Sequence, residues 1–237
     1  MLFKKNDFLK YYRFKGRKVS KKLSPAKVEL YKNLFYIYSF DNEIIHYLES
    51  KKINFDFNKK HNLKKTIIEV GFGNGENLIK QAKLNSNFFY LGSEVFVNGI
   101  ISVLKEINNN DLKNVNLSQL NFSFLLDIIK PETIDHYYIL NPDPWEKKRH
   151  HKRRLLNTET VIKIYRTLKK EGSITITTDS HSYLNQIELL ITLNSSSFDF
   201  IQIKEMMVSE PLYGATNYQR KAIANKKKIY KIQISRN

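Results

Sequence analysis

The sequence contains no cysteine, which excludes disulfide bonds, thiolate zinc sites and a cysteine nucleophile. It also contains no run approaching the roughly 20 apolar residues of a membrane-spanning helix, and its N-terminus lacks the apolar core of a signal peptide. We therefore expect a cytoplasmic protein. Hydrophobic residues nevertheless make up 41% of the 237 residues and aromatic residues 13%, so a wholly disordered chain is excluded.

Acidic residues are scarce, since 23 Asp and Glu stand against 40 Lys and Arg and give a net charge of +17. The basic excess gathers in three segments: eleven basic and two acidic residues in 1–32, six basic residues in 147–154, and seven basic and no acidic residues in 220–237. Such concentration is typical of a surface that binds a polyanion, because each neutralised phosphate releases counterions. Merely solvated charge in a Lys-rich chain is the alternative.

The N-terminal part of the chain differs from the rest. Residues 1–23 are basic and aromatic without sustained periodicity, which predicts a mobile basic arm. One short helix is expected to begin after Ser24, because Pro25 suits the first helical position. The Lys- and Asn-rich stretch 50–65 is typical of a linker or loop.

Strand-like and helix-like segments alternate through the remainder of the chain. The expected strands are 66–70, 88–94, 115–120, 134–140, 173–178, about 199–208 and 229–235. The expected helices are 76–84, 99–107, about 158–170 with Gly172 closing it, and 181–193. This alternation predicts a doubly wound α/β domain with a mostly parallel sheet, and the last two strands predict an antiparallel closing edge.

A turn with glycine at every second position follows the first expected strand. Gly71, Gly73 and Gly75 tolerate positive φ and let a ligand approach the backbone. In an open α/β sheet, a turn at this end of a strand is where nucleotide-like ligands bind. The spacing is GxGxG rather than GxGxxG, because position 76 is Glu, so a dinucleotide site fits less well. A purely structural tight turn is the alternative.

Two acids and an amide add to this prediction. Glu69 interrupts an apolar strand just before the turn, and Glu94 ends the next strand, where a carboxylate can accept both hydroxyls of a ribose. An acid-lined cleft suits the positive charges of S-adenosylmethionine better than a dinucleotide. Asn121 follows the third strand and could bond an adenine edge. Alternatively, Glu69 faces solvent and Glu94 caps the following helix.

The most specific segment follows the fourth expected strand. Pro142 and Pro144 restrict the backbone on either side of Asp143, so its carboxylate is held in a stiff loop at the carboxyl edge of the sheet. Trp145, the only tryptophan, could stack on a base or cover the core, and the basic run 147–154 follows it.

Taken in order, these motifs resemble the bacterial tRNA (guanine-N7-)-methyltransferase family over roughly residues 66–235. The resemblance rests on 69–75, 92–94, 142–154, Thr178-Asp179 and 216–219. It implies a Rossmann-like class I methyltransferase domain at 63–237, preceded by a basic arm and helix at 1–62. It also implies methyl transfer from S-adenosylmethionine to the guanine at position 46 in the tRNA variable loop.

The resemblance assigns roles residue by residue. With Gly71 and Gly73 of the turn, the expected cofactor contacts are Glu69, Glu94, Asn121 and Asp143, and Asp143 is also the expected catalytic acid. The expected tRNA contacts are Lys147, Asp179, Thr216, Asn217, Tyr218 and Gln219. The chain departs from the family at Asn121, Asn141 and Gln219, where Asp, Phe and Glu are usual.

Guanine N7 attacks with a lone pair and loses no proton, so catalysis should rest on alignment and electrostatics rather than a general base. Asp143 or Asp179 would accept hydrogen bonds from guanine N1–H and its amine, although Asp179 could instead cap a helix. The neighbouring His150 and His151 lack an acidic partner at ligand spacing, so no metal is expected.

Two other functions stay open on the sequence. The chain could be a methyltransferase for rRNA or protein, or a nucleic-acid-binding protein with a degenerate site. The sequence predicts tRNA as partner and no membrane contact, and it does not decide between a monomer and a homodimer.

Overall fold

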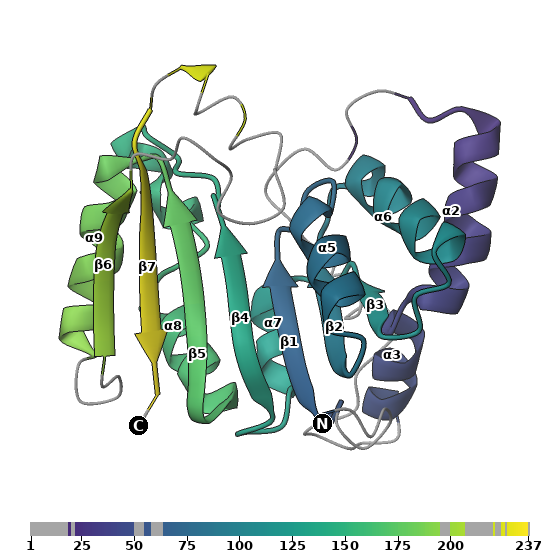
Figure 1. The fold of residues 1–237 in the computed structure, drawn as a ribbon, viewed down its shortest axis with the longest axis horizontal. Coiled ribbons are helices and arrows are strands. Elements are labelled where there is room, and N and C mark those ends of the chain that lie inside the picture. Colours follow the sequence, from purple (N-terminus) through teal and green to yellow (C-terminus); the bar gives the residue numbers. More distant parts are fainter. Residues whose placement is uncertain are drawn as a thin grey trace.

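A computed structural model describes residues 19, 22–49, 55–57, 64–194, 200–206, 220, 224–225 and 227–236. Within them lies a sheet of seven strands in the order β3-β2-β1-β4-β5-β7-β6 (Figure 1). The strands are β1 (Lys65–Val70), β2 (Phe88–Ser93), β3 (Val115–Ser118), β4 (Ile134–Leu140), β5 (Leu168–Thr178), β6 (Phe200–Met206) and β7 (Ile229–Ser235). All seven strands predicted from the sequence are present, but β5 begins at Leu168, five residues before its predicted start.

Strands β1 to β5 are parallel, and β7 pairs antiparallel with both β5 and β6. The predicted doubly wound sheet with an antiparallel closing edge is therefore confirmed. From β1 the chain moves outward to β2 and β3 and then returns to β4 on the other side of β1. In open α/β sheets such a reversal marks the crevice in which ligands bind, here expected at the carboxyl ends of β1 and β4.

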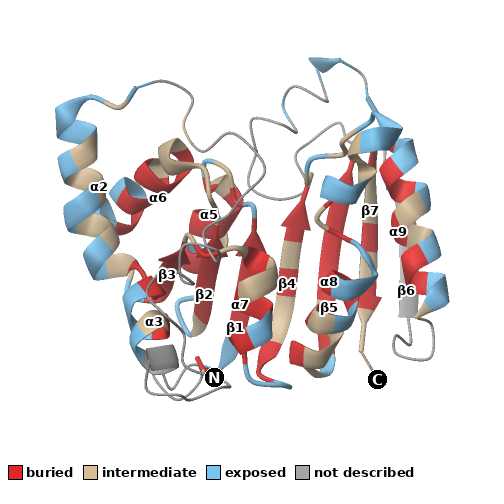
Figure 2. Ribbon diagram, turned by 180° about the vertical axis from the view of Figure 1, so that it is seen from behind, coloured by how far each residue is buried: buried red, intermediate tan, exposed pale blue. Residues whose placement is uncertain are grey.

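Helices cover both faces of the sheet (Figures 1 and 2). On one face lie α5 (Glu76–Leu84) and α6 (Val97–Asn109), with α2 (Pro25–Tyr38) packed on α6. On the other lie α7 (Phe122–Ile128), α8 (Thr158–Thr167) and α9 (His181–Leu193). Because successive strand residues point to opposite faces, Ile67 packs with the α5–α6 core, whereas Ile68 and Val70 pack with the other.

The N-terminal segment contributes more to the core than its composition predicted. The helix expected after Ser24 is present as α2, but a second helix, α3 (Asp41–Glu49), follows it. Phe55 and Phe57, inside the stretch expected to be a linker, are buried in one core cluster with Phe89 of β2. The expected domain boundary after residue 62 stays a prediction, and much of the expected arm 1–23 lies outside the described residues.

The end of α8 was predicted wrongly. The helix stops at Thr167, and Leu168 already pairs with Ile134 in the sheet. Gly172 lies inside β5 and not at a helix end. A β-carbon at this position would come within 2.8 Å of the Lys169 carbonyl oxygen. The glycine therefore marks a tight irregularity of the strand, not a helix cap.

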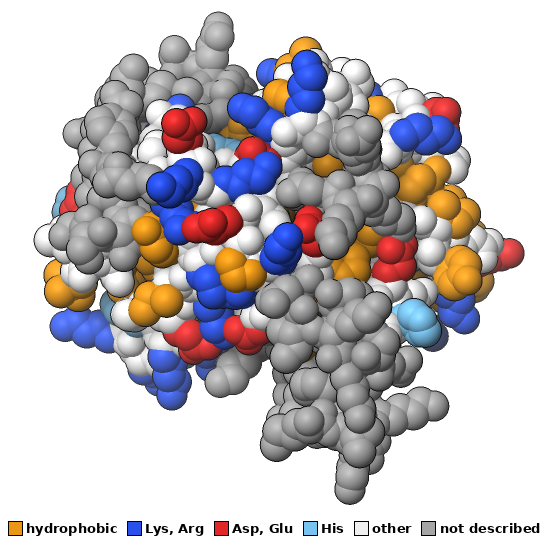
Figure 3. Space-filling view, turned by 90° about the horizontal axis from the view of Figure 1, so that it is seen from below, with side chains coloured by type: hydrophobic (Ala, Val, Ile, Leu, Met, Phe, Trp, Pro, Cys, Tyr) orange, Lys and Arg blue, Asp and Glu red, His pale blue; other side chains and the backbone are white. Residues whose placement is uncertain are grey.

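The edge of the sheet opposite the crevice carries charges of both signs, which lie next to one another in Figure 3. Lys169 pairs with Asp135 at 2.8 Å, and Arg236 pairs with Glu132 at 2.7 Å. These two basic side chains are thus neutralised by acidic partners within the protein. In the described part of the chain, no helix is long and apolar enough to cross a bilayer.

Candidate active site

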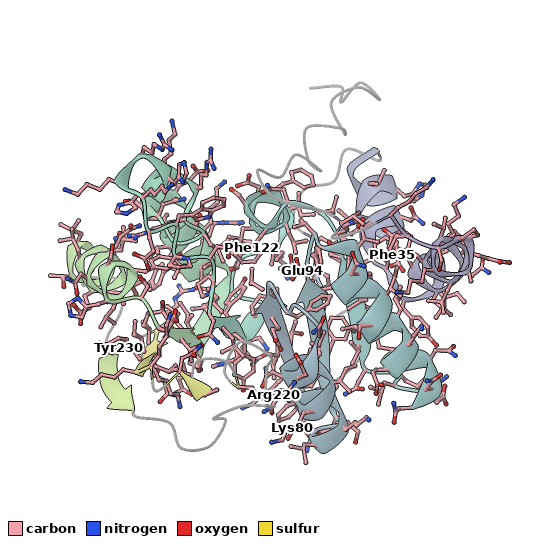
Figure 4. The ribbon with its side chains drawn as sticks, turned by 90° about the horizontal axis from the view of Figure 1, so that it is seen from above. Phe35, Lys80, Glu94, Phe122, Arg220 and Tyr230 are labelled. Carbon is pink, nitrogen blue, oxygen red and sulfur yellow. The ribbon has the colours of Figure 1, made fainter. Side chains whose placement is uncertain are left out.

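Three loops meet at the carboxyl edge of the central strands, which Figure 4 shows from above with Glu94 near its middle. They follow β1, β2 and β4, and β1 pairs with both of the other strands. Gly73, Glu94 and Asp143 therefore lie on the same edge of the sheet. The topology therefore brings the glycine turn and Asp143 to one edge of the sheet, as the sequence predicted.

The glycine turn needs its glycines for conformation and leaves space above two of them. The φ angles of Gly71, Gly73 and Gly75 are 68°, 57° and 79°, in the region that disfavours side chains. A β-carbon on Gly71 or Gly73 would meet nothing within 4 Å. Open space over a backbone without side chains is what a closely approaching ligand requires.

The carboxylate of Glu94 links the turn to the end of β2. It accepts hydrogen bonds from the backbone N–H groups of Gly73 at 2.9 Å, Val95 at 2.7 Å and Phe96 at 3.0 Å. Burial raises the pKa of Glu94, the negative charge of Asp143 raises it further, and the three N–H donors oppose this rise. The carboxylates of Glu94 and Asp143 are therefore close enough for their charges to interact at this edge of the sheet.

Helix α6 packs directly against the turn. A β-carbon on Gly99 would lie 2.0 Å from the carbonyl oxygen of Gly73, and one on Gly75 would lie 2.1 Å from Val103 Cγ2. Both contacts leave no room for a methyl group. Gly99 in the first turn of α6 and Val103 in the second therefore pack closely against the glycine turn.

Glu69 is only 2% exposed, which overturns the alternative that it faces solvent, while its predicted cofactor contact stays a prediction. Its Oε2 accepts a 2.7 Å hydrogen bond from Nδ2 of Asn77 in α5, a residue that sequence reasoning missed. Burial raises the pKa of Glu69 to about 8, despite the opposing Asn77 bond, and the charges of Glu76 and Glu94 add to the rise. The sequence offered one indication of this role, since Asn77 is a polar residue next to the apolar positions of α5.

Asn121 has a structural role in the described geometry. It is the N-cap of α7, where its Oδ1 accepts from the backbone N–H groups of Ser123 at 3.0 Å and Phe124 at 3.4 Å. Its predicted contact with an adenine ring stays a prediction.

The loop after β4 has an unusual backbone. Asn141 and Trp145 adopt positive φ angles of 50° and 44°, and Asn tolerates this region better than Phe. The Asn141 N–H bonds the Thr177 carbonyl oxygen at 2.9 Å, which anchors the loop to β5. Asp143 is exposed between these positions, and Trp145 packs under the Arg153 guanidinium at 4.9 Å.

The expected tRNA contacts are only partly described. Lys147 is exposed just before the 3₁₀ helix η1 (Lys148–Arg153), and Asp179 follows β5 and pairs with Lys227 at 3.0 Å. Residues 216–219 lie outside the described residues. Arg220, which follows them, contacts Glu76 at 3.4 Å and lies on the α5 side in Figure 4.

A surface groove of about 860 Å³ runs between α5 and α6 and borders the glycine turn at Asn74 and Gly75. It contains neither Glu94 nor Asp143, so it is a different surface from the cleft. Within the described residues, no cluster of three His, Asp or Glu side chains could hold a metal ion.

Comparison with known proteins places this geometry in a family. A family model described as "Putative methyltransferase" matches residues 63–232. A bifunctional methyltransferase of Rickettsia prowazekii is 32% identical over 208 residues, which are 88% of this chain and 37% of that protein. The chain therefore spans little more than a third of the length of that relative.

Two further matches bear on fold and family. The crystal structure of the 16S rRNA methyltransferase KamB superposes with a TM-score of 0.60 at 10% identity, covering 78% of this chain and 95% of that one, which shows the fold alone. A tRNA (guanine-N(7)-)-methyltransferase of Buchnera aphidicola subsp. Schizaphis graminum is 34% identical over 172 residues, 69% of each chain. On these matches and the geometry of the cleft, the chain belongs to the tRNA (guanine-N(7)-)-methyltransferase family.

Proposed function

We propose that this protein transfers a methyl group from S-adenosylmethionine to N7 of a guanine in tRNA, at position 46 of the variable loop. The observation that carries the proposal is that the glycine turn and the loop of Asp143 follow the paired strands β1 and β4, at the point where the strand order reverses. The name of the Buchnera relative supports tRNA guanine as the substrate. The expected location is the cytoplasm.

The residues of the cleft fit this cofactor. The space above Gly71 and Gly73 admits a ligand close to the backbone, and the Glu94 carboxylate lies beside it. Glu94 would accept the ribose hydroxyls, since each carboxylate oxygen has more than one lone pair. The negative side chains of Glu94 and Asp143 favour a ligand that carries positive charge. Glu69 and Asn77 are both buried, and their hydrogen bond would hold α5 against the end of β1 next to the turn.

When bound, S-adenosylmethionine supplies a methyl group on a positively charged sulfur. Guanine N7, a neutral nucleophile with a lone pair, would accept this methyl group as the sulfur leaves, and the purine would then carry the positive charge. Asp143 would accept hydrogen bonds from the guanine N1–H and amine, which orients the base and stabilises this charge. No side chain needs to remove a proton in this step.

The basic segments would hold the tRNA backbone. Lys147 and the exposed part of η1 follow Asp143 directly, so phosphates bound there would lie next to the target base. Asp179, on the neighbouring strand end, would give up its ion pair with Lys227 to contact the substrate.

The decisive experiment maps 7-methylguanosine in tRNA after incubation with the purified protein and labelled S-adenosylmethionine. Label at the variable-loop guanine supports the proposal, and parallel reactions with rRNA and protein test the other substrates. Label only in rRNA or protein, or no label despite measured cofactor binding, contradicts it. Failure to bind S-adenosylmethionine by calorimetry would instead favour a nucleic-acid-binding protein.

A further inference from the structure

The basic run 147–154 does not behave as one surface. Arg154 is only 3% exposed, whereas Arg149 and Lys152 of the same run are exposed. A buried arginine cannot reach a phosphate of a bound RNA without leaving its site. Its role must therefore be sought inside the protein.

All the nitrogen atoms of the Arg154 guanidinium have partners. Nε donates to the Pro144 carbonyl oxygen at 2.7 Å. Nη1 donates to Gln186 Oε1 at 2.7 Å and to the Ser182 carbonyl oxygen at 3.3 Å, while Nη2 donates to Ser182 Oγ at 2.9 Å. His151 Nε2 also lies 3.1 Å from Nη2. Four of the five N–H donors of this arginine thus bond oxygen atoms of the protein, and the fifth faces His151, so the guanidinium is committed to partners within the protein.

The contacts connect the catalytic loop to a rigid element. Ser182 and Gln186 lie one helical turn apart on α9, and the guanidinium stacks over the ring of Tyr183 at 4.9 Å. Pro144, the partner of Nε, directly follows Asp143 in the chain. Arg154 therefore joins the peptide next to Asp143 to α9.

Two further bonds hold the same region. Glu146 Oε1 accepts a 2.6 Å hydrogen bond from Ser180 Oγ at the start of α9, and the Leu156 N–H donates to Tyr183 Oη at 3.0 Å. The loop is thus tied to α9 on both sides of the basic run. Arg154 is the only one of these links that reaches the proline-bracketed segment itself, among the residues described.

We propose that Arg154 is a positioning residue, which holds the Asp143 carboxylate at the reacting guanine by fixing the Pro144 carbonyl against α9. This inference rests on the proposed function, because Asp143 must act on the substrate. Pro142 and Pro144 leave the backbone around Asp143 little freedom, so one anchored carbonyl fixes the direction of the Cα–Cβ bond from which the carboxylate extends. A displacement of about 1 Å at a reacting centre can cost on the order of a hundredfold in rate.

The variant Arg154→Lys separates this role from phosphate binding, because it keeps the charge but cannot span Pro144, Ser182 and Gln186. We expect kcat to fall about tenfold or more, with the KM for tRNA and the salt dependence of tRNA binding nearly unchanged. The contrast variant Arg149→Ala removes an exposed charge from the same run. It should raise KM and lower the slope of log K against log salt by about 0.7–0.9.

Trp145 gives a readout that does not require activity. As the single tryptophan, it reports on the loop by fluorescence, and Arg154→Lys should shift its emission in the absence of tRNA. Unchanged emission and unchanged kcat would overturn the inference, as would an Arg154→Lys effect confined to KM and the salt slope. If the wild-type protein does not methylate tRNA, but Arg154→Lys still shifts the Trp145 emission, the result contradicts the proposed function and not the link between Arg154 and the loop.

A milder variant covers the case in which Arg154→Lys does not fold. Ser182→Ala removes one acceptor of the guanidinium from an exposed position of α9, and Asn185→Ala on the same helix is its matched control. We expect Ser182→Ala to lower kcat several-fold and to shift Trp145 emission, while Asn185→Ala changes neither. Identical behaviour of the two variants would overturn the inference.

Discussion

The backbone N–H of Gly73 donates a 2.9 Å hydrogen bond to Glu94 Oε2, so one carboxylate joins the glycine turn of β1 to the end of β2. The other oxygen of Glu94 holds the turn that leads into α6. The residue predicted to bind a ribose is therefore also the residue that shapes the surface on which the ribose would lie. Its substitution should affect both.

Replacing Glu94 by Gln tests this dual role. In either orientation of the amide, its NH₂ group faces a backbone N–H donor, so the turn loses at least one bond. We expect the affinity for S-adenosylmethionine to fall about tenfold to a hundredfold, measured by calorimetry. Glu106→Gln, on the exposed side of α6, serves as control. Equal affinities for the two variants would contradict the role of Glu94.

Replacing Gly99 by Ala tests the packing of α6 on the glycine turn. The added methyl group would collide with the Gly73 carbonyl oxygen, a backbone atom that cannot move without displacing the turn. We expect a loss of about 1–3 kcal/mol in the free energy of unfolding in urea and weaker cofactor binding. Ser102→Ala on the same helix is the control. Wild-type stability of Gly99→Ala would show that the packing is not this tight.

Glu69 should make stability depend on pH. Its pKa, raised from 4.5 to about 8 by burial, means that the folded protein keeps a proton that the unfolded chain loses above about pH 4.5. The stabilisation is complete below the unfolded pKa and is lost as pH rises to about 8. The free energy of unfolding should therefore fall by at most about 1.4 kcal/mol per pH unit in this window.

The variant Glu69→Gln isolates that contribution. The Gln amide can accept from Asn77 Nδ2 and donate to Asn77 Oδ1, a buried oxygen without a hydrogen-bond partner in the described structure. Urea unfolding at pH 6, 7 and 8 should show a flatter pH dependence for Glu69→Gln than for the wild type, with cofactor binding retained. Parallel pH curves would rule out a protonated Glu69, and loss of cofactor binding would favour direct contact.

Asp143→Ala should reduce kcat by about a hundredfold to a thousandfold in a tRNA methylation assay, because the developing charge on the base loses its carboxylate. Binding of S-adenosylmethionine should remain measurable by calorimetry. Asp127→Ala, at an exposed position of α7, controls for a general loss of negative charge. Near-normal methylation by Asp143→Ala would remove its catalytic role.

Binding of tRNA should weaken steeply with salt, because phosphate contacts release counterions. A variant without residues 1–18, which carry seven Lys and Arg against one Asp, should show a smaller slope of log K against log salt. The slope should decrease by about 0.7–0.9 for each phosphate that this segment neutralises. Filter binding between low and moderate salt measures it, and equal slopes would mean that this segment does not bind the tRNA.

The sequence was informative where local chemistry is sufficient. Glycine spacing after an apolar strand predicted the turn, and two prolines predicted a stiff loop around Asp143, because positive φ and fixed φ are properties of single residues. Hydrophobic periodicity placed the strands and most helices, but it missed α3 and α7, and it extended α8 too far.

Burial of individual polar residues could not be derived in the same way. Arg149 and Arg154 are alike in the sequence, yet one is exposed and the other is enclosed by α9, because residues about thirty positions later in the chain surround it. Glu69 acquires its raised pKa only once the folded protein buries it, and its hydrogen bond with Asn77 opposes that rise. The sequence by itself determined the backbone conformations and the charges available, whereas the packing of distant elements decided which charges meet solvent and which meet each other.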